Sequence, residues 1–165
     1  MVERSEPQYE LPERAMLEEW LDYHRATLEW KCEGLSAEQL RERTVPPSSL
    51  SLLGLVRHMA DVERNWFRRA LALQDAPGIF WTVDNEDGDF DDVDDASAQE
   101  AFDAWHNEID HARGIAAGME LDDTGIRRGE KVSLRWVYVH MIEEYARHNG
   151  HADFLRERID GATGD

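Results

Sequence analysis

Apolar residues recur at alternating steps of three and four along four long stretches of the sequence, a spacing typical of helices that bury one face. The stretches cover about residues 13–31, 51–73, 97–117 and 133–159. No segment shows the alternation of a convincing strand, no solenoid-length repeat occurs, and no linker divides the chain. The pattern predicts an all-α fold, a four-helix bundle formed by residues 1–165 as a single domain.

Serine motifs and glycines mark the expected helix ends. Residues 36–39 (Ser-Ala-Glu-Gln) read as a capping box that opens a short helix, and residues 97–100 repeat the pattern before the third long helix. Gly34 and Gly118 follow the first and third long helices, where glycine commonly ends a helix. We expect residues 119–132 to form a polar connection.

A long connection without helical period covers residues 74–96, and this length permits a crossover between the second and third helices. Its residues 84–95 carry eight carboxylates. An EF-hand calcium loop with Gly88 in the sixth position would need ligands at Val83 and Asp94, and both depart from the pattern. A solvated acidic loop is the favoured interpretation.

Polar residues replace apolar ones in the middle of the fourth helix. Glu144, His148 and His151 fall on the steps between Met141 and Leu155, where a plain bundle would place leucine. Buried polar groups are costly unless they are paired or bind a metal. Glu144 and His148 are four residues apart, about 6 Å along one face, so both side chains can reach one cation.

The second helix can complete this group, because His58 borders its apolar face. Two imidazoles and one carboxylate form a three-ligand set that leaves coordination positions open, as in a catalytic zinc site. The same set suits non-haem iron. A hydrogen-bonded His–Glu pair without metal remains open on spacing alone. A di-iron bundle is not favoured, because it needs two Glu-x-x-His motifs and Glu144 precedes His148 by four residues.

The other histidines are weaker candidates for metal ligands. His106 and His111 lie off the seam of the third helix and are interpreted as surface residues. His24 lies on the first seam, where a hydrogen-bonded core role is favoured over contact with a substrate. His140 lies one turn before Glu144, and we expect it near the site without binding the ion.

Charge and composition limit the classes of molecule that the protein is expected to bind. The formal net charge of −18 argues against nucleic acid and anionic membrane surfaces, which need cationic patches. No apolar run is long enough to span a bilayer, and the charged N-terminus lacks the apolar region of a secretory signal. With Cys32 as the single cysteine, we expect a cytoplasmic protein that acts on a small molecule.

Three segments carry a family resemblance. Residues 51–63 (Ser51 to Glu63, around His58) with Trp66-Phe67 resemble the second-helix signature of the DinB-like superfamily. Residues 134–153 resemble its fourth-helix signature. Residues 31–36 are similar to an uncharacterised actinobacterial branch related to mycothiol-dependent enzymes. The resemblance implies an up-down-down-up four-helix bundle.

The resemblance also implies a divalent metal, zinc or nickel, held by His58, Glu144 and His148. Many relatives have histidine at position 144, and glutamate there resembles the branch of mycothiol-dependent maleylpyruvate isomerases. That isomerase has an additional C-terminal domain without counterpart in this sequence, so its activity is not expected. Many relatives have glutamine at the position of His151, which is therefore a candidate substrate-side group without being an assigned ligand.

The implied activity is a metal-dependent S-transfer that joins a low-molecular-weight thiol, of the mycothiol or bacillithiol type, to a small electrophile. His151, Arg147 and His140 are candidates for proton transfer or thiol orientation. The alternatives are a non-enzymatic divalent-metal-binding stress-response protein and a helical scaffold with a polar core cluster. A homodimer is expected because relatives commonly form one.

Overall fold

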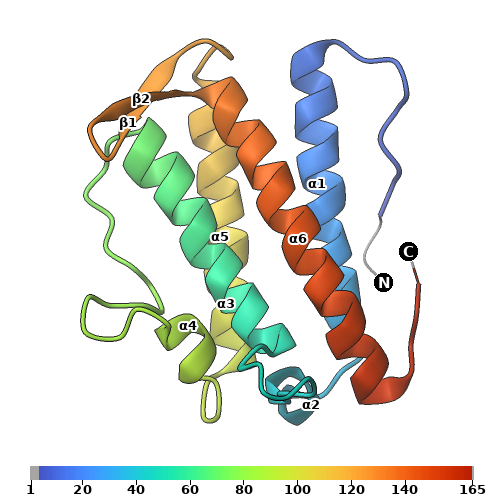
Figure 1. Cartoon of the computed structure of the whole chain (residues 1–165). Helices are drawn as coiled ribbons and strands as arrows, with labels where there is room; N and C mark the ends of the chain where they lie inside the picture. The colour runs from blue at the N-terminus through green and yellow to red at the C-terminus, as the bar shows by residue number, and fades with distance from the viewer. Residues whose placement is uncertain (1–3, 165) are drawn as a thin grey trace.

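The computed structural model describes residues 4–164, and helices dominate it (Figure 1). The long ones are α1 (Glu13–Cys32), α3 (Leu52–Glu63), its π-helical continuation η1 (Arg64–Leu71), α5 (Ala98–Ala117) and α6 (Leu134–Asp160). The predicted all-α class is thus confirmed in its main feature. Short helices α2 (Ala37–Arg41) and α4 (Gly88–Asp91) lie between the long ones.

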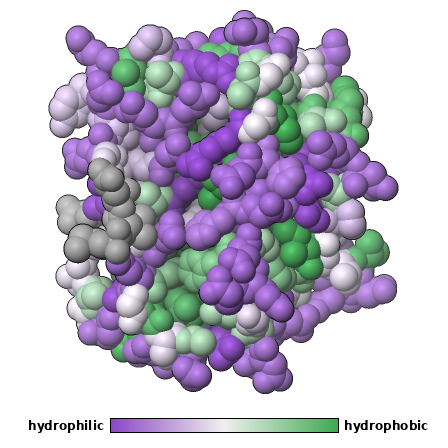
Figure 2. All heavy atoms as spheres, turned by 180° about the vertical axis from the view of Figure 1, so that it is seen from behind, coloured by the Kyte–Doolittle hydropathy of each residue, from purple (hydrophilic) through white to green (hydrophobic). Residues whose placement is uncertain are grey.

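The long helices lie side by side, with α1 packed mainly against α6 and α3 mainly against α5. Their facing apolar residues form one cluster that is closed to solvent. Its largest fully buried side chains come from all four long helices and include Leu21, Leu55, Trp105, Met141 and Tyr145. Figure 2 shows that mostly hydrophilic side chains cover the face behind that of Figure 1.

A buried polar network joins the four long helices. Arg25 of α1 donates from Nε and Nη2 to the two carboxylate oxygens of Glu63 in α3, each at 2.8 Å. Tyr145 of α6 donates to Glu63 Oε1 at 2.8 Å and accepts from Nε1 of Trp105 in α5 at 2.8 Å. Buried charges are tolerated when they are paired and hydrogen-bonded in this way.

The predicted helix ends are largely confirmed. The Ser36 hydroxyl accepts from the Gln39 backbone N–H and the Gln39 side chain accepts from the Ser36 N–H, so the capping box before α2 is complete. Ser97 caps α5 through its side chain. Gly34 has a φ of +80° just after α1, a left-handed conformation that glycine adopts without steric cost.

The absence of strands was a wrong prediction. Strands β1 (Thr124–Arg127) and β2 (Glu130–Ser133) form an antiparallel hairpin within the expected polar connection, with Gly125 opposite Val132. Each strand has four residues and one buried position, so the hairpin leaves almost no hydrophobic period in the sequence. It lies beside the end of η1 and leads into α6 (Figure 1).

The second helix also departs from the prediction. Residues 64–71 adopt π-helical turns, as in the bond from Ala72 N–H to the Phe67 carbonyl at 2.9 Å. Leu73, the last residue of the predicted second helix, lies beyond the observed helix with a φ of +54° and 63% exposure. A change from 3.6 to wider turns shifts the helical face, so steps of three and four fail at this end.

The acidic connection is not simply solvated, which corrects a further prediction. Its α4 turn packs on α3, where Arg57 donates to the Gly88 carbonyl at 2.8 Å and to the Asp89 carbonyl at 3.0 Å. Gly54 permits this contact, because an added Cβ would lie 2.9 Å from the Phe90 ring. The connection therefore covers one side of α3. Across residues 4–164, no helix combines the length and apolarity needed to cross a bilayer.

Candidate metal centre

The three predicted ligands meet between α3 and α6. His58, Glu144 and His148 each offer a ligand atom, and these atoms lie within 4.8 Å of one another. His148 Nε2 is 3.5 Å from Glu144 Oε2, and the rings of His58 and His148 are 4.7 Å apart by centroid. All three side chains are partly buried. The residues that the sequence put forward as a metal set are therefore close in space.

Each imidazole of this cluster has a partner at its Nδ1 atom. His58 Nδ1 lies 2.7 Å from Asp89 Oδ2, and His148 Nδ1 lies 3.4 Å from His151 Nδ1. Metal-binding histidines commonly use one ring nitrogen for the ion and the other for an orienting hydrogen bond. This pattern leaves the Nε2 atoms of His58 and His148 available to bind one metal ion.

The donor set fits a divalent metal. Imidazole nitrogen and carboxylate oxygen are ligands for zinc, nickel and iron, and three protein ligands leave positions open for a substrate. The hydrogen bond with His148 lowers the pKa of the Glu144 carboxyl, with further contributions from His140 and His58. Glu144 is therefore held in the anionic form that coordination requires.

The candidate ligands lie at the edge of the core, which differs from the sequence interpretation. Glu144 and His148 are only partly buried, whereas Tyr145, Asn149 and Ala152 fill the buried positions of α6. The true seam runs one residue later in this region. Polar groups thus do not replace leucines in the core; they line a partly open site between two helices.

A second group of possible ligands shares Glu144. It consists of His140, Glu143 and Glu144, with His140 Nε2 3.3 Å from Glu144 Oε1. All three residues lie on one helix, and Glu143 is exposed and paired with Arg147. The cluster that includes His58 is the stronger candidate, because it is more buried and draws ligands from two helices.

The ring of His140 packs against two tryptophan rings. Its ring stacks on Trp136 at 4.9 Å with an interplanar angle of 15°, and the ring of Trp66 is 4.5 Å away. Trp136 is 50% exposed and Trp66 is partly buried against the core, so the two rings lie at the edge of the hydrophobic cluster. They also line a cavity of about 550 Å³ with residues of the hairpin.

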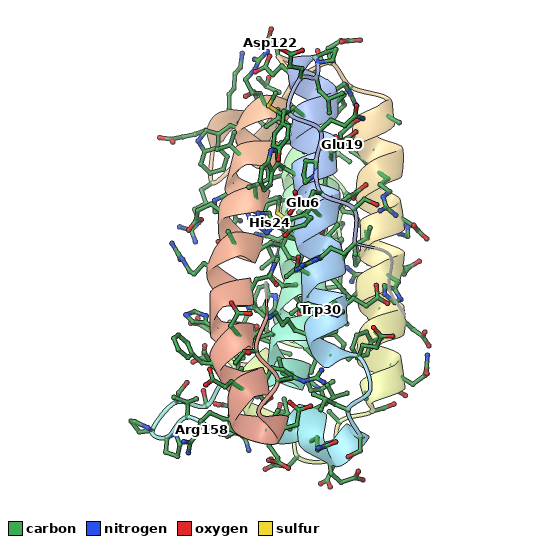
Figure 3. All side chains as sticks on the ribbon, turned by 90° about the vertical axis from the view of Figure 1, so that its right-hand side faces the viewer. Glu6, Glu19, His24, Trp30, Asp122 and Arg158 are labelled. Atoms are coloured by element: carbon green, nitrogen blue, oxygen red, sulfur yellow. The ribbon has the colours of Figure 1, made fainter. Side chains whose placement is uncertain are left out.

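The remaining candidate residues differ in how close they lie to this cluster. His151 contacts His148, and burial lowers its pKa. Arg147 has a side-chain exposure of 61% and pairs with Glu143, so the structure does not bring it to the ligands. His24 lies on the side of α1 that faces α6 (Figure 3), where the Asn149 amide donates to its backbone carbonyl at 3.0 Å. Its partly buried position agrees with a structural role.

The histidines of α5 lie at the surface, as predicted. His106 is 3.2 Å from the Glu29 carboxylate with nearly half of its side chain exposed, and His111 contacts the Asn107 carbonyl. Neither belongs to a ligand group among residues 4–164. His111 therefore offers a histidine that can be replaced without touching the site.

Asp89 and Phe90 are site residues that the sequence analysis missed. Asp89 is 5% exposed and pairs with His58, and the Phe90 ring stacks on the His58 ring at 4.9 Å. Both belong to the acidic connection. No periodicity marks that segment, and Asp89 is one of eight similar carboxylates, so its sequence carried no signal of its position.

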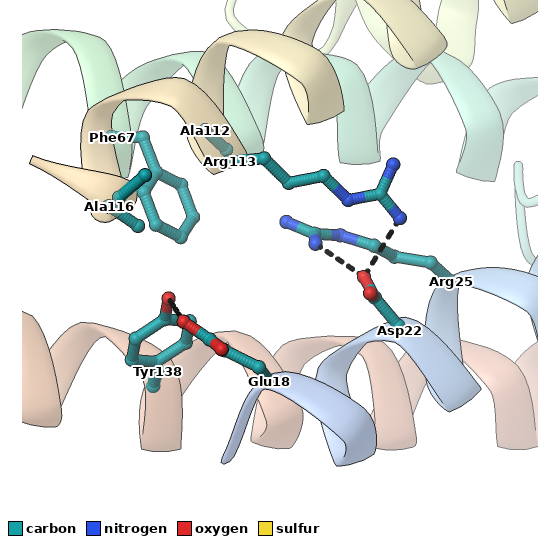
Figure 4. Close-up of a pocket in the computed structure, with 9 residues that line it drawn as sticks. Glu18, Asp22, Arg25, Phe67, Ala112, Arg113, Ala116 and Tyr138 are labelled. Carbon is teal, nitrogen blue, oxygen red and sulfur yellow. Dashed lines mark hydrogen bonds and ion pairs between the residues drawn. The ribbon is translucent and has the colours of Figure 1, made fainter. Parts of the chain in front are cut away.

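Another cavity, of about 280 Å³, opens between α1, α5 and α6 (Figure 4). Its polar groups satisfy one another: Asp22 accepts from Arg25 and Arg113, and Tyr138 donates to Glu18 at 3.0 Å. Polar groups that already pair with each other have few free donors or acceptors for a ligand. This cavity is a weaker candidate than the surroundings of His58.

The comparisons with known proteins assign the family. The family described as Mycothiol-S-transferase has a sequence model that matches residues 16–161. The chain belongs to the mycothiol S-transferase family. This confirms the predicted relation to the mycothiol-related branch of the DinB-like superfamily, and it supports a transferase enzyme. A comparison with curated proteins gives no significant match.

Proposed function

We propose that the chain is a metal-dependent S-transferase that joins mycothiol, or a thiol of its type, to a small electrophile at His58, Glu144 and His148. The observation that carries the proposal is the meeting of these three ligand atoms within 4.8 Å in a chain of the mycothiol S-transferase family. The non-enzymatic metal-binding alternative gains no support from the family.

The reaction replaces a sulfur–hydrogen bond by a sulfur–carbon bond. The thiol sulfur attacks an electrophilic carbon, and the thiol proton passes to a base. The displaced electron pair goes to the leaving group of a halide, to the ring oxygen of an epoxide or to the far carbon of an activated alkene. A divalent metal bound at the site would lower the pKa of the thiol and favour the thiolate, which is the nucleophile. Zinc and nickel are the proposed ions, since both accept imidazole and carboxylate ligands.

The chain's own residues orient the reactants. Asp89 fixes the ring of His58, and the partly open site between α3 and α6 admits the thiol. We assign the proton acceptor to His140, because its ring lies between the ligand Glu144 and the cavity lined by Trp66 and Trp136. His151 is turned toward His148, and Arg147 is exposed.

Three broader assignments accompany the proposal. The chain directions in Figure 1 support an up-down-down-up four-helix bundle: α3 and α5 run one way, α1 and α6 the other. The single cluster of buried apolar residues supports one domain. A cytoplasmic location suits an enzyme that uses an intracellular thiol, and a homodimer remains part of the proposal.

Metal content by elemental mass spectrometry tests the site. Untagged protein should retain about one zinc or nickel per chain, because three ligands suffice for tight binding of such ions. His148→Ala and Glu144→Ala should lose it, and His111→Ala, an exposed histidine outside the cluster, should keep it. A wild type that stays metal-free after incubation with both ions would rule out the metal centre.

Turnover separates the enzyme from a metal-binding protein. Mycothiol consumption should be followed with a panel of alkyl and aryl halides, epoxides and activated alkenes, using metal-loaded protein. We expect catalysis above the solution rate that His148→Ala abolishes. Full metal occupancy without turnover on any electrophile would favour the non-enzymatic alternative.

A further inference from the structure

Three arginines gather beside the metal ligands. Arg69 at the end of η1, with Arg127 and Arg128 at the tip of the hairpin, line a cavity of about 530 Å³ together with His58. We call it the arginine cavity. Arg127 and Arg128 also line the neighbouring cavity that contains Trp66 and Trp136, so the two spaces meet at the hairpin. Three arginines in one cavity are unexpected in a chain of net charge −18, in which carboxylates outnumber cationic side chains two to one.

These arginines lack carboxylate partners. Most others in the described part of the chain donate to a carboxylate or a carbonyl, as do Arg25, Arg57 and Arg64. Within residues 4–164, no hydrogen bond or ion pair is formed by the guanidinium groups of Arg69, Arg127 or Arg128. Arg127 lies over the Trp66 ring at 5.3 Å and Arg69 over the Trp81 ring at 5.9 Å.

The carboxylates in the arginine cavity are engaged elsewhere. Asp61 accepts from the backbone N–H groups of Ile79 and Phe80 at 2.7 and 2.9 Å, and Asp89 contacts His58. Glu86, the third carboxylate of the lining, is exposed at the rim. None of the three carboxylates forms an ion pair with Arg69, Arg127 or Arg128, so the guanidinium donors remain available to a ligand.

Two of these arginines, Arg127 and Arg128, occupy energetically unfavourable positions. Arg128 has a φ of +52° and precedes Gly129 at +85° in the two-residue turn of the hairpin. Such turns favour Asn, Asp or Gly at the first position, and a bulky side chain there is strained by about 1 kcal/mol. Burial and the charges of Arg128 and Arg69 also lower the pKa of Arg127. Retaining unfavourable features beside a reactive centre is typical of a binding site.

Guanidinium groups without ion-pair partners favour a ligand that carries an anionic group. Mycothiol does not supply it, because its cysteine is acetylated at nitrogen and joined through its carboxyl to an uncharged sugar. The other reactant is the electrophile. Arginine pairs carboxylates through two parallel hydrogen bonds, a geometry that orients as well as attracts.

We propose that the arginine cavity selects electrophiles that carry a carboxylate, held by Arg69, Arg127 and Arg128 with the reactive carbon directed toward His58, Glu144 and His148. The aromatic surface of Trp66 and Trp136 contacts the apolar body of the same molecule. This assignment rests on the proposed transferase function for the reaction, whereas the binding of the anion is a property of the cavity itself.

A matched pair of electrophiles tests the selection. 4-(Bromoacetamido)benzoate and bromoacetanilide share one reactive carbon and differ by the carboxylate. With mycothiol, each forms a thioether as the C–Br bond breaks, bromide leaves with the electron pair, and the thiol proton is released. The measured quantity is the ratio of kcat/KM for the anionic over the neutral substrate, corrected for the solution reaction.

Three variants with one control give the comparison. Arg69→Gln, Arg127→Gln and Arg128→Asn each remove one guanidinium, and asparagine tolerates the left-handed turn position of Arg128. The control is Arg158→Gln, at the far end of α6 from the hairpin (Figure 3). The wild type and the control should favour the anionic substrate, and each variant should lower the ratio about 10-fold.

An equilibrium measurement separates the cavity from the chemistry. Calorimetry with unreactive 4-acetamidobenzoate and acetanilide should show preferential binding of the anion by the wild type and Arg158→Gln. That preference should be lost in Arg127→Gln and Arg128→Asn. If turnover fails but this preference holds, the proposed function is wrong and the anion site stands. Equal binding and equal turnover of both members of each pair by the wild type would overturn the inference.

Discussion

Nδ1 of His58 lies 2.7 Å from Oδ2 of Asp89, although the two residues are 31 positions apart in the sequence. The contact joins a helix of the core to the acidic connection. It fixes the orientation of the imidazole and leaves Nε2 free to bind a metal ion together with Glu144 and His148. A carboxylate in this position also makes the ring nitrogen a better ligand, as in the carboxylate–histidine pairs of zinc proteins.

Replacing Asp89 by asparagine should weaken zinc binding by about 10- to 100-fold, because the amide supports the histidine ring without charge. Competition against a chromogenic chelator measures the affinity. Asp91→Asn is the matched control, since Asp91 lies in the same turn and forms no contact with a histidine. Equal affinities for both variants would show that Asp89 serves only the fold of the connection.

The buried network should contribute strongly to stability. Tyr145→Phe removes the hydroxyl that donates to Glu63 and accepts from Trp105, and it leaves both partners buried. We expect a loss of about 1–3 kcal/mol in the free energy of unfolding, because buried groups without partners carry a desolvation cost. Urea denaturation measures it. Tyr9→Phe, at a tyrosine with 94% exposure, should change the free energy little.

The long helices were predictable because their burial patterns extend over several turns. The start of α5 at Ala98 and its end at Ala117 fall within a residue of the prediction. The hairpin was not predictable, because β1 and β2 are held by Gly125 against η1 and by one buried valine, contacts distant in sequence. Short elements whose stability comes from tertiary packing leave little local signal.

The candidate site could be predicted in part for the same reason. Glu144 and His148 were visible through their spacing on one helix, and His58 through its place beside an apolar face. Asp89 was hidden, because its position depends on how Arg57 and Gly54 hold the α4 turn against α3. A contact made by an irregular segment cannot be deduced from period alone.

The single cysteine should be inert in the folded protein. Cys32 is buried, and burial raises the pKa of its thiol to about 12. Since the thiolate is the reactive form, iodoacetamide at pH 8 should label Cys32 only in denaturant. Mass spectrometry of the intact chain measures the labelling. Rapid modification under native conditions would show that the end of α1 opens readily, and it would complicate assays with thiol-reactive substrates.

The same raised pKa predicts a loss of stability at high pH. The folded state keeps the thiol protonated, so its contribution is complete below the unfolded pKa of about 9 and declines as the pH rises toward 12. Cys32→Ala should flatten this decline between pH 9 and 10, below the range where the buried tyrosines titrate. Urea midpoints at several pH values provide the measurement. Parallel curves for both proteins would contradict the assignment.

Gly125 should be indispensable for the hairpin that carries Arg127 and Arg128. A Cβ at this position would lie 1.9 Å from the Ala70 carbonyl oxygen and 2.6 Å from the Leu71 Cα, both backbone atoms that cannot move aside. Gly125→Ala should therefore displace the hairpin from η1. Hydrogen exchange should show lost protection in residues 124–133 while α1 stays protected. Gly114→Ala is the matched control: Gly114 lies exposed in α5 with no neighbour within 4 Å, so alanine should stabilise the helix by up to about 1 kcal/mol. If Gly125→Ala kept the hairpin protected, the close packing of β1 on η1 would not be what holds the arginines beside His58.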